Sequence, residues 1–189
     1  MIMFLNDIPL SLIRHNDLPC YVKEGYGAKS IEEWPMYTFF LSYHQGRKEQ
    51  AIKDFVEWYD DQLAKYHATA KAEGGMYRGS LYTLIEKHCA VPFAEVDSVC
   101  KAEAVRERVL QRFHLYEVIQ EEGYRPERAE RILAFKKNGC VYLEGGHHRA
   151  AILRVLGKDT LPSVLVFPNQ FIYNLVRFLR NIKHGNFHK

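Results

Sequence analysis

Apolar residues in the first half of the chain recur mostly at the spacing of amphipathic helices. Over residues 47–70 they return every three or four positions, opposite a face of Lys, Asp and Glu, at Ala51, Phe55, Trp58, Tyr59, Leu63 and Tyr66. A shorter helix is expected over residues 35–43. Before it, Pro and Gly interrupt the chain, and residues 11–14 or 21–22 are alternative short strands. This half is therefore predicted to be mostly helical.

The second half alternates helical and strand-like segments. A helix is expected to begin at Asp97 and to end at Gly123. Three strand-like runs follow, at residues 131–135, 140–143 and 161–167. Asn138-Gly139, between the first two runs, is typical of a tight hairpin turn, and residues 170–183 are expected to form a last amphipathic helix.

These elements predict an α/β (α+β) protein with a small mixed sheet. The composition of the chain changes near residue 95. We therefore expect a mostly helical N-terminal extension over residues 1–95 and a second domain, which contains the sheet and ends in the amphipathic helix, over residues 96–189.

The segment Val-Tyr-Leu-Glu-Gly-Gly-His-His-Arg, residues 141–149, is the strongest candidate for a functional site. A short apolar run ends at paired glycines, after which two histidines and an arginine open a helix. Glycine lets a ligand approach the backbone closely, and a helix N-terminus favours an anion. A basic residue in the first helical turn opposes the helix dipole unless an anion is bound there. The segment predicts a phosphate-binding turn; the alternative is an ordinary strand-to-helix turn with two surface histidines.

The order of elements around this segment resembles the ParB N-terminal/sulfiredoxin-like superfamily over roughly residues 105–167. That family binds nucleotides at the corresponding turn: CTP in ParB proteins, ATP in sulfiredoxins, and a phosphoryl donor in a free serine kinase. The resemblance implies that Gly145 and Gly146 admit the phosphates and that His148 and Arg149 clamp them. It also implies ATP or CTP as the ligand, with Mg²⁺ held through the phosphates rather than by a protein metal site.

Two positions depart from the family pattern. Sulfiredoxins carry a cysteine where this chain has His147, so the thiol chemistry of a reductase is not expected. Many relatives carry an acidic residue at the position of Gly145, whereas here Glu144 lies one residue earlier and on the opposite face of a strand. Glu144 and His147 are the nearest candidates for catalytic residues. Alternatively, His147 is a spacer that faces solvent or a polar group that faces the ligand.

A second candidate anion site is the segment over residues 74–80. Three glycines accompany Arg78 and Ser80, and Ser80 can also cap a short helix. If this segment folded over the turn at residues 145–149, Arg78 and Ser80 would close the site. The alternative is a plain loop between two helices.

Composition and charge narrow the compartment and the partners. Hydrophobic residues make up 47% of the chain, which excludes general disorder, and the net charge is only +3. The last nineteen residues contain no acid but four basic residues, Arg177, Arg180, Lys183 and Lys189. Contact of this segment with nucleic acid or an anionic membrane is therefore the alternative to packing on the core.

Four scattered cysteines without a C-x-x-C pair argue against a disulfide framework. No apolar run is long enough to span a membrane, and we expect a cytoplasmic protein.

Together these observations predict a nucleoside-triphosphate-dependent phosphotransferase or hydrolase that acts on a small-molecule acceptor. One alternative is a ParB-like, nucleotide-dependent, DNA-associated switch, which is not favoured because no helix-turn-helix pattern follows the turn. The other is a nucleotide-binding module without catalysis, which the missing acid at Gly145 leaves open. The sequence predicts neither the acceptor nor the oligomeric state.

Overall fold

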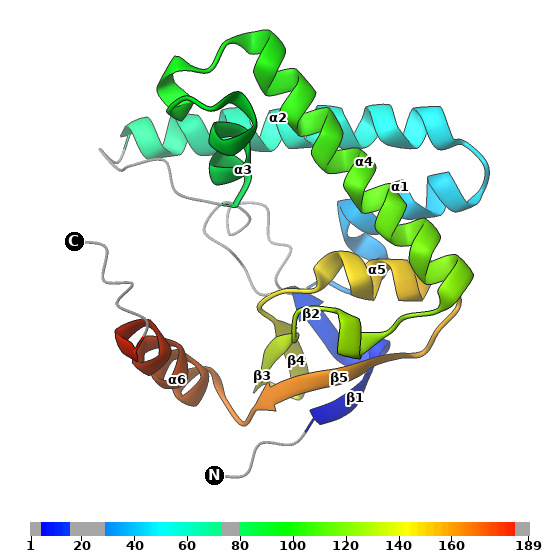
Figure 1. Cartoon of the computed structure of the whole chain (residues 1–189). Helices are drawn as coiled ribbons and strands as arrows, with labels where there is room; N and C mark the ends of the chain where they lie inside the picture. The colour runs from blue at the N-terminus through cyan, green and yellow to red at the C-terminus, as the bar shows by residue number, and fades with distance from the viewer. Residues whose placement is uncertain (1–4, 16–28, 73–79, 184–189) are drawn as a thin grey trace. The chain divides into compact units, whose positions relative to one another are not determined.

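The computed structural model describes residues 5–15, 29–72 and 80–183, which form two compact units (Figure 1). One, the sheet unit, comprises residues 1–37 and 119–189, and the other, the helical unit, comprises residues 38–118. This division differs from the expected boundary near residue 95, because strands close to the N-terminus belong to the sheet of the C-terminal half.

The sheet has five strands in the order β1-β5-β3-β4-β2. Their bounds are β1 Leu5–Pro9, β2 Ile13–His15, β3 Leu133–Lys137, β4 Cys140–Leu143 and β5 Thr160–Phe167. β1 runs antiparallel to β5 and β3 antiparallel to β4, whereas β5 is parallel to β3 and β2 is parallel to β4. The predicted class, α+β with a small mixed sheet, is therefore confirmed.

The hairpin between β3 and β4 follows the sequence signal closely. Asn138 and Gly139 both have positive φ angles, 51° and 75°, as a two-residue type I′ turn requires. β4 matches its predicted range, whereas β3 begins at Leu133, two residues later than expected.

Two helices complete the sheet unit, α5 over His147–Val155 and α6 over Gln170–Lys183. Ala150, Ala151 and Ile152 of α5 are fully buried. On α6, the ring of Tyr173 lies 5.5 Å from the rings of both Phe135 and Phe167. The first part of the amphipathic C-terminal helix is therefore docked on the sheet.

The helical unit contains α2, α3 and most of α1 and α4. The first residues of α1, up to Tyr37, and the last residues of α4, from Ile119, belong to the sheet unit. The bounds of these helices are α1 Pro35–His44, α2 Lys48–Ala72, α3 Ser80–Cys89 and α4 Ser98–Glu122. Most of the predicted apolar face of α2 is buried, namely Ala51, Phe55, Tyr59 and Leu63. Trp58 is partly exposed, and the side chain of Tyr66 is not among those that the structure describes. Aromatic rings form much of this core: Phe40, Phe55 and Phe113 lie edge to face, with centroids 5.6–6.1 Å apart.

α4 begins where the sequence predicts, directly after Asp97. Oδ1 of Asp97 accepts hydrogen bonds from the backbone N–H groups of Val99 and Cys100, at 2.8 and 2.9 Å. This side chain satisfies N–H groups of the first turn, which have no partner within the helix.

The cysteine expectation was wrong for one pair. Cys89, the last residue of α3, and Cys100, in the first turn of α4, form a disulfide with their Cα atoms 5.9 Å apart. The reversal of the chain between these helices brings together two cysteines that the sequence separates by eleven positions. Cys140 is a free thiol in β4.

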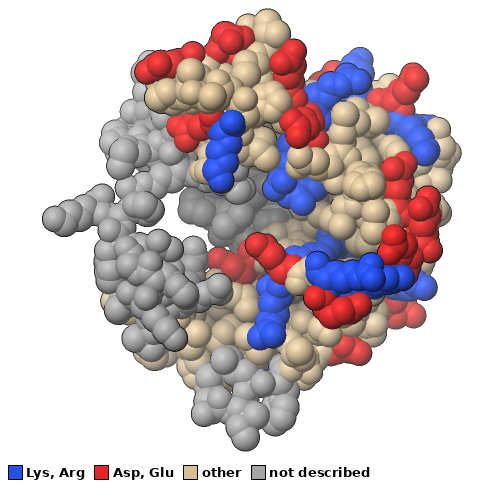
Figure 2. All heavy atoms as spheres, in the orientation of Figure 1, with Lys and Arg blue, Asp and Glu red and all other residues tan. Residues whose placement is uncertain are grey.

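On the face drawn in Figure 2, Lys and Arg side chains are interspersed with Asp and Glu side chains. None of the described helices combines the length and the apolar composition that a membrane span requires.

Candidate functional site

The turn between β4 and α5 is held at both ends by backbone hydrogen bonds. The N–H of Glu144 donates to the carbonyl oxygen of Leu133 at 2.9 Å, which extends the pairing with β3 past the end of β4. The N–H of Ala150 donates to the carbonyl oxygen of Gly146 at 2.9 Å, which opens α5. The residues between these two bonds are the predicted phosphate-binding turn.

The two glycines of the turn have different roles. Gly146 precedes α5 with φ +79°, and a Cβ at this position would lie 2.6 Å from Cδ1 of Ile132. Both the left-handed backbone and the close packing therefore require glycine at Gly146. A Cβ at Gly145, by contrast, would meet no atom within 4 Å, so the space beside Gly145 is open.

His147 is turned into the interior of the sheet unit. Its side chain is 9% exposed, its Nε2 lies 3.1 Å from the carbonyl oxygen of Leu143, and its ring meets Trp34 edge to face at 5.7 Å. A carbonyl oxygen only accepts, so this contact places a proton on Nε2. Trp34 is itself 1% exposed, and its indole N–H donates to the carbonyl oxygen of Lys29 at 3.3 Å. His147 thus links the end of β4 to the first turn of α5.

Arg149 contacts the segment that precedes β3. Its Nη1 donates to the carbonyl oxygen of Glu130 at 2.6 Å and lies 3.4 Å from the hydroxyl of Tyr124. Nη1 of Arg149, the residue expected to clamp a phosphate, is therefore already bonded to other protein atoms. His148 is partly buried, and its Nε2 is shielded from solvent.

A hollow of about 430 Å³ lies next to this arginine. Tyr124 and Glu130, the two partners of Arg149, line it together with Arg131, Ser163 and Ile132, the residue that packs on Gly146. The hollow falls in the size range of small-molecule sites. Sequence reasoning missed Tyr124, Glu130 and Ile132 as neighbours of the turn, and no local pattern marks them, because the fold alone brings them there.

The remaining predicted site residues are only partly placed. Arg78 lies outside the described residues, and Ser80 is the first residue of α3 with a side chain that is not described. Closure of the turn by Arg78 and Ser80 stays a prediction. Glu144 is partly buried and directly precedes Gly145. Within the described ranges, no three His, Cys, Asp or Glu side chains are grouped so that they could hold a metal ion.

The resemblance to the ParB/sulfiredoxin-like superfamily stays a prediction from the order of elements and the glycine turn in the sequence. Comparison with family models, with curated proteins and with solved structures gave no match to this chain.

Proposed function

We propose that the sheet unit binds a nucleoside triphosphate at the turn between β4 and α5. We further propose that the protein is a phosphotransferase or nucleotide hydrolase that acts on a small-molecule acceptor. The observation that carries the proposal is the left-handed Gly146 at the start of α5, with open space beside Gly145 and Arg149 next to a hollow of about 430 Å³.

The phosphates would lie against the start of α5. The first N–H groups of a helix and its positive dipole end favour an anion, and the open side of Gly145 permits close approach. Among the described residues Arg149 uses only Nη1, so Nε and Nη2 are available to a phosphate in the planar fork that suits it. His148, the residue before Arg149, would be a second donor through Nδ1, since its Nε2 is shielded from solvent.

The rest of the nucleotide would occupy the hollow beside Arg149. Tyr124 offers an aromatic ring, and Arg131 and Ser163 offer polar groups, on the wall of this hollow. Ile132 both lines the hollow and packs on Gly146, so the hollow and the turn have this residue in common.

Phosphoryl transfer depends mainly on positioning and on charge stabilisation. Mg²⁺ held by the phosphates would neutralise charge on the transferred group, and Glu144 is the neighbouring carboxylate that could orient it or accept a proton from the acceptor. We assign His147 a positioning role, because its ring bonds to Leu143 and packs on Trp34.

Titration of the full chain with ATP, CTP and GTP in the presence of Mg²⁺ tests the proposal by calorimetry. Arg149→Gln should weaken the best triphosphate about tenfold or more, since an arginine–phosphate bond is charge-assisted. Arg149→Lys should retain part of the affinity. Arg128→Gln, at an exposed arginine of the same unit, should leave it unchanged. Failure of all three nucleotides to bind would refute the proposal.

A binding module without catalysis is the second candidate. It is supported by the glycine at position 145, where relatives carry an acid, and by the interior position of His147. Tight binding of a triphosphate without turnover, over a panel of sugars and amino acids as acceptors, would favour this candidate over the enzyme.

We also propose that the protein is located in the cytoplasm, because nucleoside triphosphates are supplied there. In that compartment the disulfide between Cys89 and Cys100 would be exposed to reducing conditions. Alkylation of thiols in freshly lysed cells tests this point: two modified cysteines at these positions would support the location, and a protected pair would argue for an oxidising compartment.

A further inference from the structure

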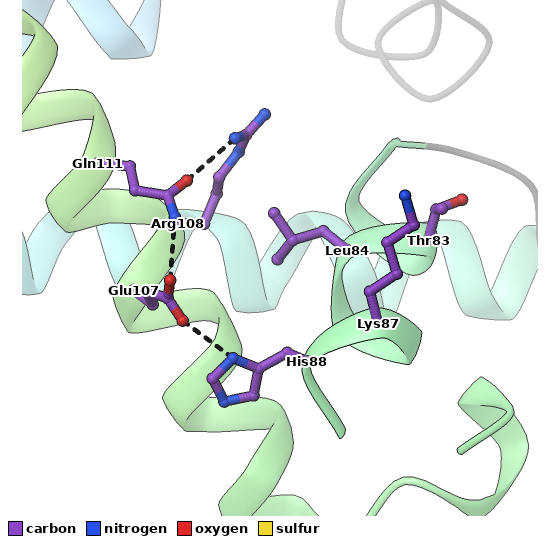
Figure 3. A pocket seen from close by; sticks show the side chains of 7 residues that line it. All are labelled: Thr83, Leu84, Lys87, His88, Glu107, Arg108 and Gln111. Carbon is purple, nitrogen blue, oxygen red and sulfur yellow. Dashed lines mark hydrogen bonds and ion pairs between the residues drawn. The ribbon is translucent and has the colours of Figure 1, made fainter. Parts of the chain in front are cut away.

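A second hollow, of about 400 Å³, lies within the helical unit between α3 and α4 (Figure 3). Thr83, Leu84, Lys87 and His88 of α3 line one side, and Glu107, Arg108 and Gln111 of α4 line the other. In the view of Figure 3, Leu84 lies between Arg108 and Lys87. The hollow therefore combines the apolar side chain of Leu84 with one cationic side chain from each helix and with the carboxylate of Glu107.

Hydrogen bonds along α4 hold Arg108 next to a neutral partner. Nη1 of Arg108 donates to Oε1 of Gln111 at 3.2 Å, and Nε2 of Gln111 donates to Oε1 of Glu107 at 3.0 Å. The other carboxylate oxygen of Glu107 lies 2.9 Å from Nδ1 of His88 on α3. Glu107, the acid nearest in sequence to Arg108, is thus engaged by Gln111 and His88.

Two cations and one carboxylate therefore line the hollow, and the carboxylate of Glu107 is bonded to Gln111 and His88 rather than to either cation. Neither Lys87 nor Arg108 forms an ion pair with any acid in the described part of the chain. Burial lowers the pKa of Arg108, and the positive charge of Arg112, one turn further along α4, lowers it again. An anion in the hollow would relieve both effects, because it would replace the lost hydration and offset the repulsion between the two arginines.

We propose that this hollow binds a small molecule with a phosphate monoester group, whose apolar part lies on Leu84. A phosphate monoester is close to a dianion at neutral pH and has three acceptor oxygens, which match one ammonium, one guanidinium and the hydroxyl of Thr83. A carboxylate ligand carries only one charge, so its attraction to Lys87 and Arg108 would be weaker than that of a dianion. The site is confined to the helical unit, so it does not depend on the function proposed for the sheet unit.

Binding of phenyl phosphate to the full chain tests the inference, measured by calorimetry or by NMR shifts of α3 and α4. Saturable binding is expected, tighter than that of inorganic phosphate, because only the ester has an apolar part. Lys87→Gln and Arg108→Gln should each weaken binding about tenfold, the loss expected for one charge-assisted hydrogen bond. Arg106→Gln, at an exposed arginine of the same helix, is the matched control and should change nothing.

Three results would overturn the inference. They are the absence of saturable binding, tighter binding of benzoate than of phenyl phosphate, and loss of binding in Arg149→Gln but not in Lys87→Gln. The last result would place the anion in the sheet unit. Since Lys87 is exposed and unpaired in the described residues, Lys87→Gln should fold normally, and Arg108→Lys gives a second variant that keeps the charge.

Discussion

Nε2 of His147 lies 3.1 Å from the carbonyl oxygen of Leu143, so a side chain at the start of α5 closes back onto the last residue of β4. The bond spans the whole glycine turn. Together with the contact between His147 and Trp34, it fixes the direction in which α5 leaves the sheet.

His147→Ala should therefore lower the free energy of unfolding. The variant loses a buried hydrogen bond and the ring contact with Trp34, and we expect a loss of about 2 kcal/mol in urea unfolding. His147→Phe keeps a ring at this position but leaves the Leu143 carbonyl oxygen without its partner, so it should recover only part of the loss. A fully stable His147→Ala that has lost catalytic turnover would instead indicate a direct role in catalysis.

The two glycines before α5 provide a matched pair of substitutions. Gly146→Ala should cost about 2 kcal/mol or more of unfolding free energy, because it places a Cβ 2.6 Å from Ile132 at a backbone angle that L residues rarely adopt. Gly145→Ala meets open space and should change stability by less than about 1 kcal/mol. Equal effects of the two substitutions would contradict the geometry of the turn.

The sequence predicted elements whose signals are local. The Asn138-Gly139 hairpin, the start of α4 after Asp97 and the exact range of α6 all follow from neighbouring residues. β1 could not be predicted in this way, because its five residues pair with β5 more than 150 positions later. The same limit applies to the candidate site: helical periodicity does not reveal that His147 points inward or that Arg149 meets the carbonyl oxygen of Glu130.

The disulfide between Cys89 and Cys100 should stabilise the helical unit. Closing a loop of about a dozen residues restricts the unfolded chain and contributes about 3 kcal/mol. Cys100→Ser, or reduction of the native chain, should therefore lower the melting temperature. The substitution Cys140→Ser is the control, since Cys140 is not part of a disulfide. An unchanged melting temperature on reduction, with both thiols then accessible to alkylation, would show that the bond contributes nothing to stability.

The pair formed by Tyr43 and Glu117 predicts a loss of stability at alkaline pH. The hydroxyl of Tyr43 donates to Oε1 of Glu117 at 2.7 Å, and burial together with this carboxylate raises the pKa of Tyr43 from 10.0 to about 12. Because the folded state holds this proton more tightly than the unfolded state, the contribution is fully present below pH 10 and is lost as the pH rises toward 12.

Tyr43→Phe should thus be less stable than the native chain at pH 8, and the difference between the two in unfolding free energy should narrow as the pH rises above 10. Urea unfolding over this range measures the difference. With Glu117→Gln present in both chains the narrowing should be smaller, since a neutral amide does not repel the tyrosinate, and only the effect of burial remains. If the difference in unfolding free energy between the native chain and Tyr43→Phe stays constant from pH 8 to pH 12, Tyr43 has the same pKa in the folded and the unfolded chain. That result would contradict the effect of burial and of the contact with Glu117.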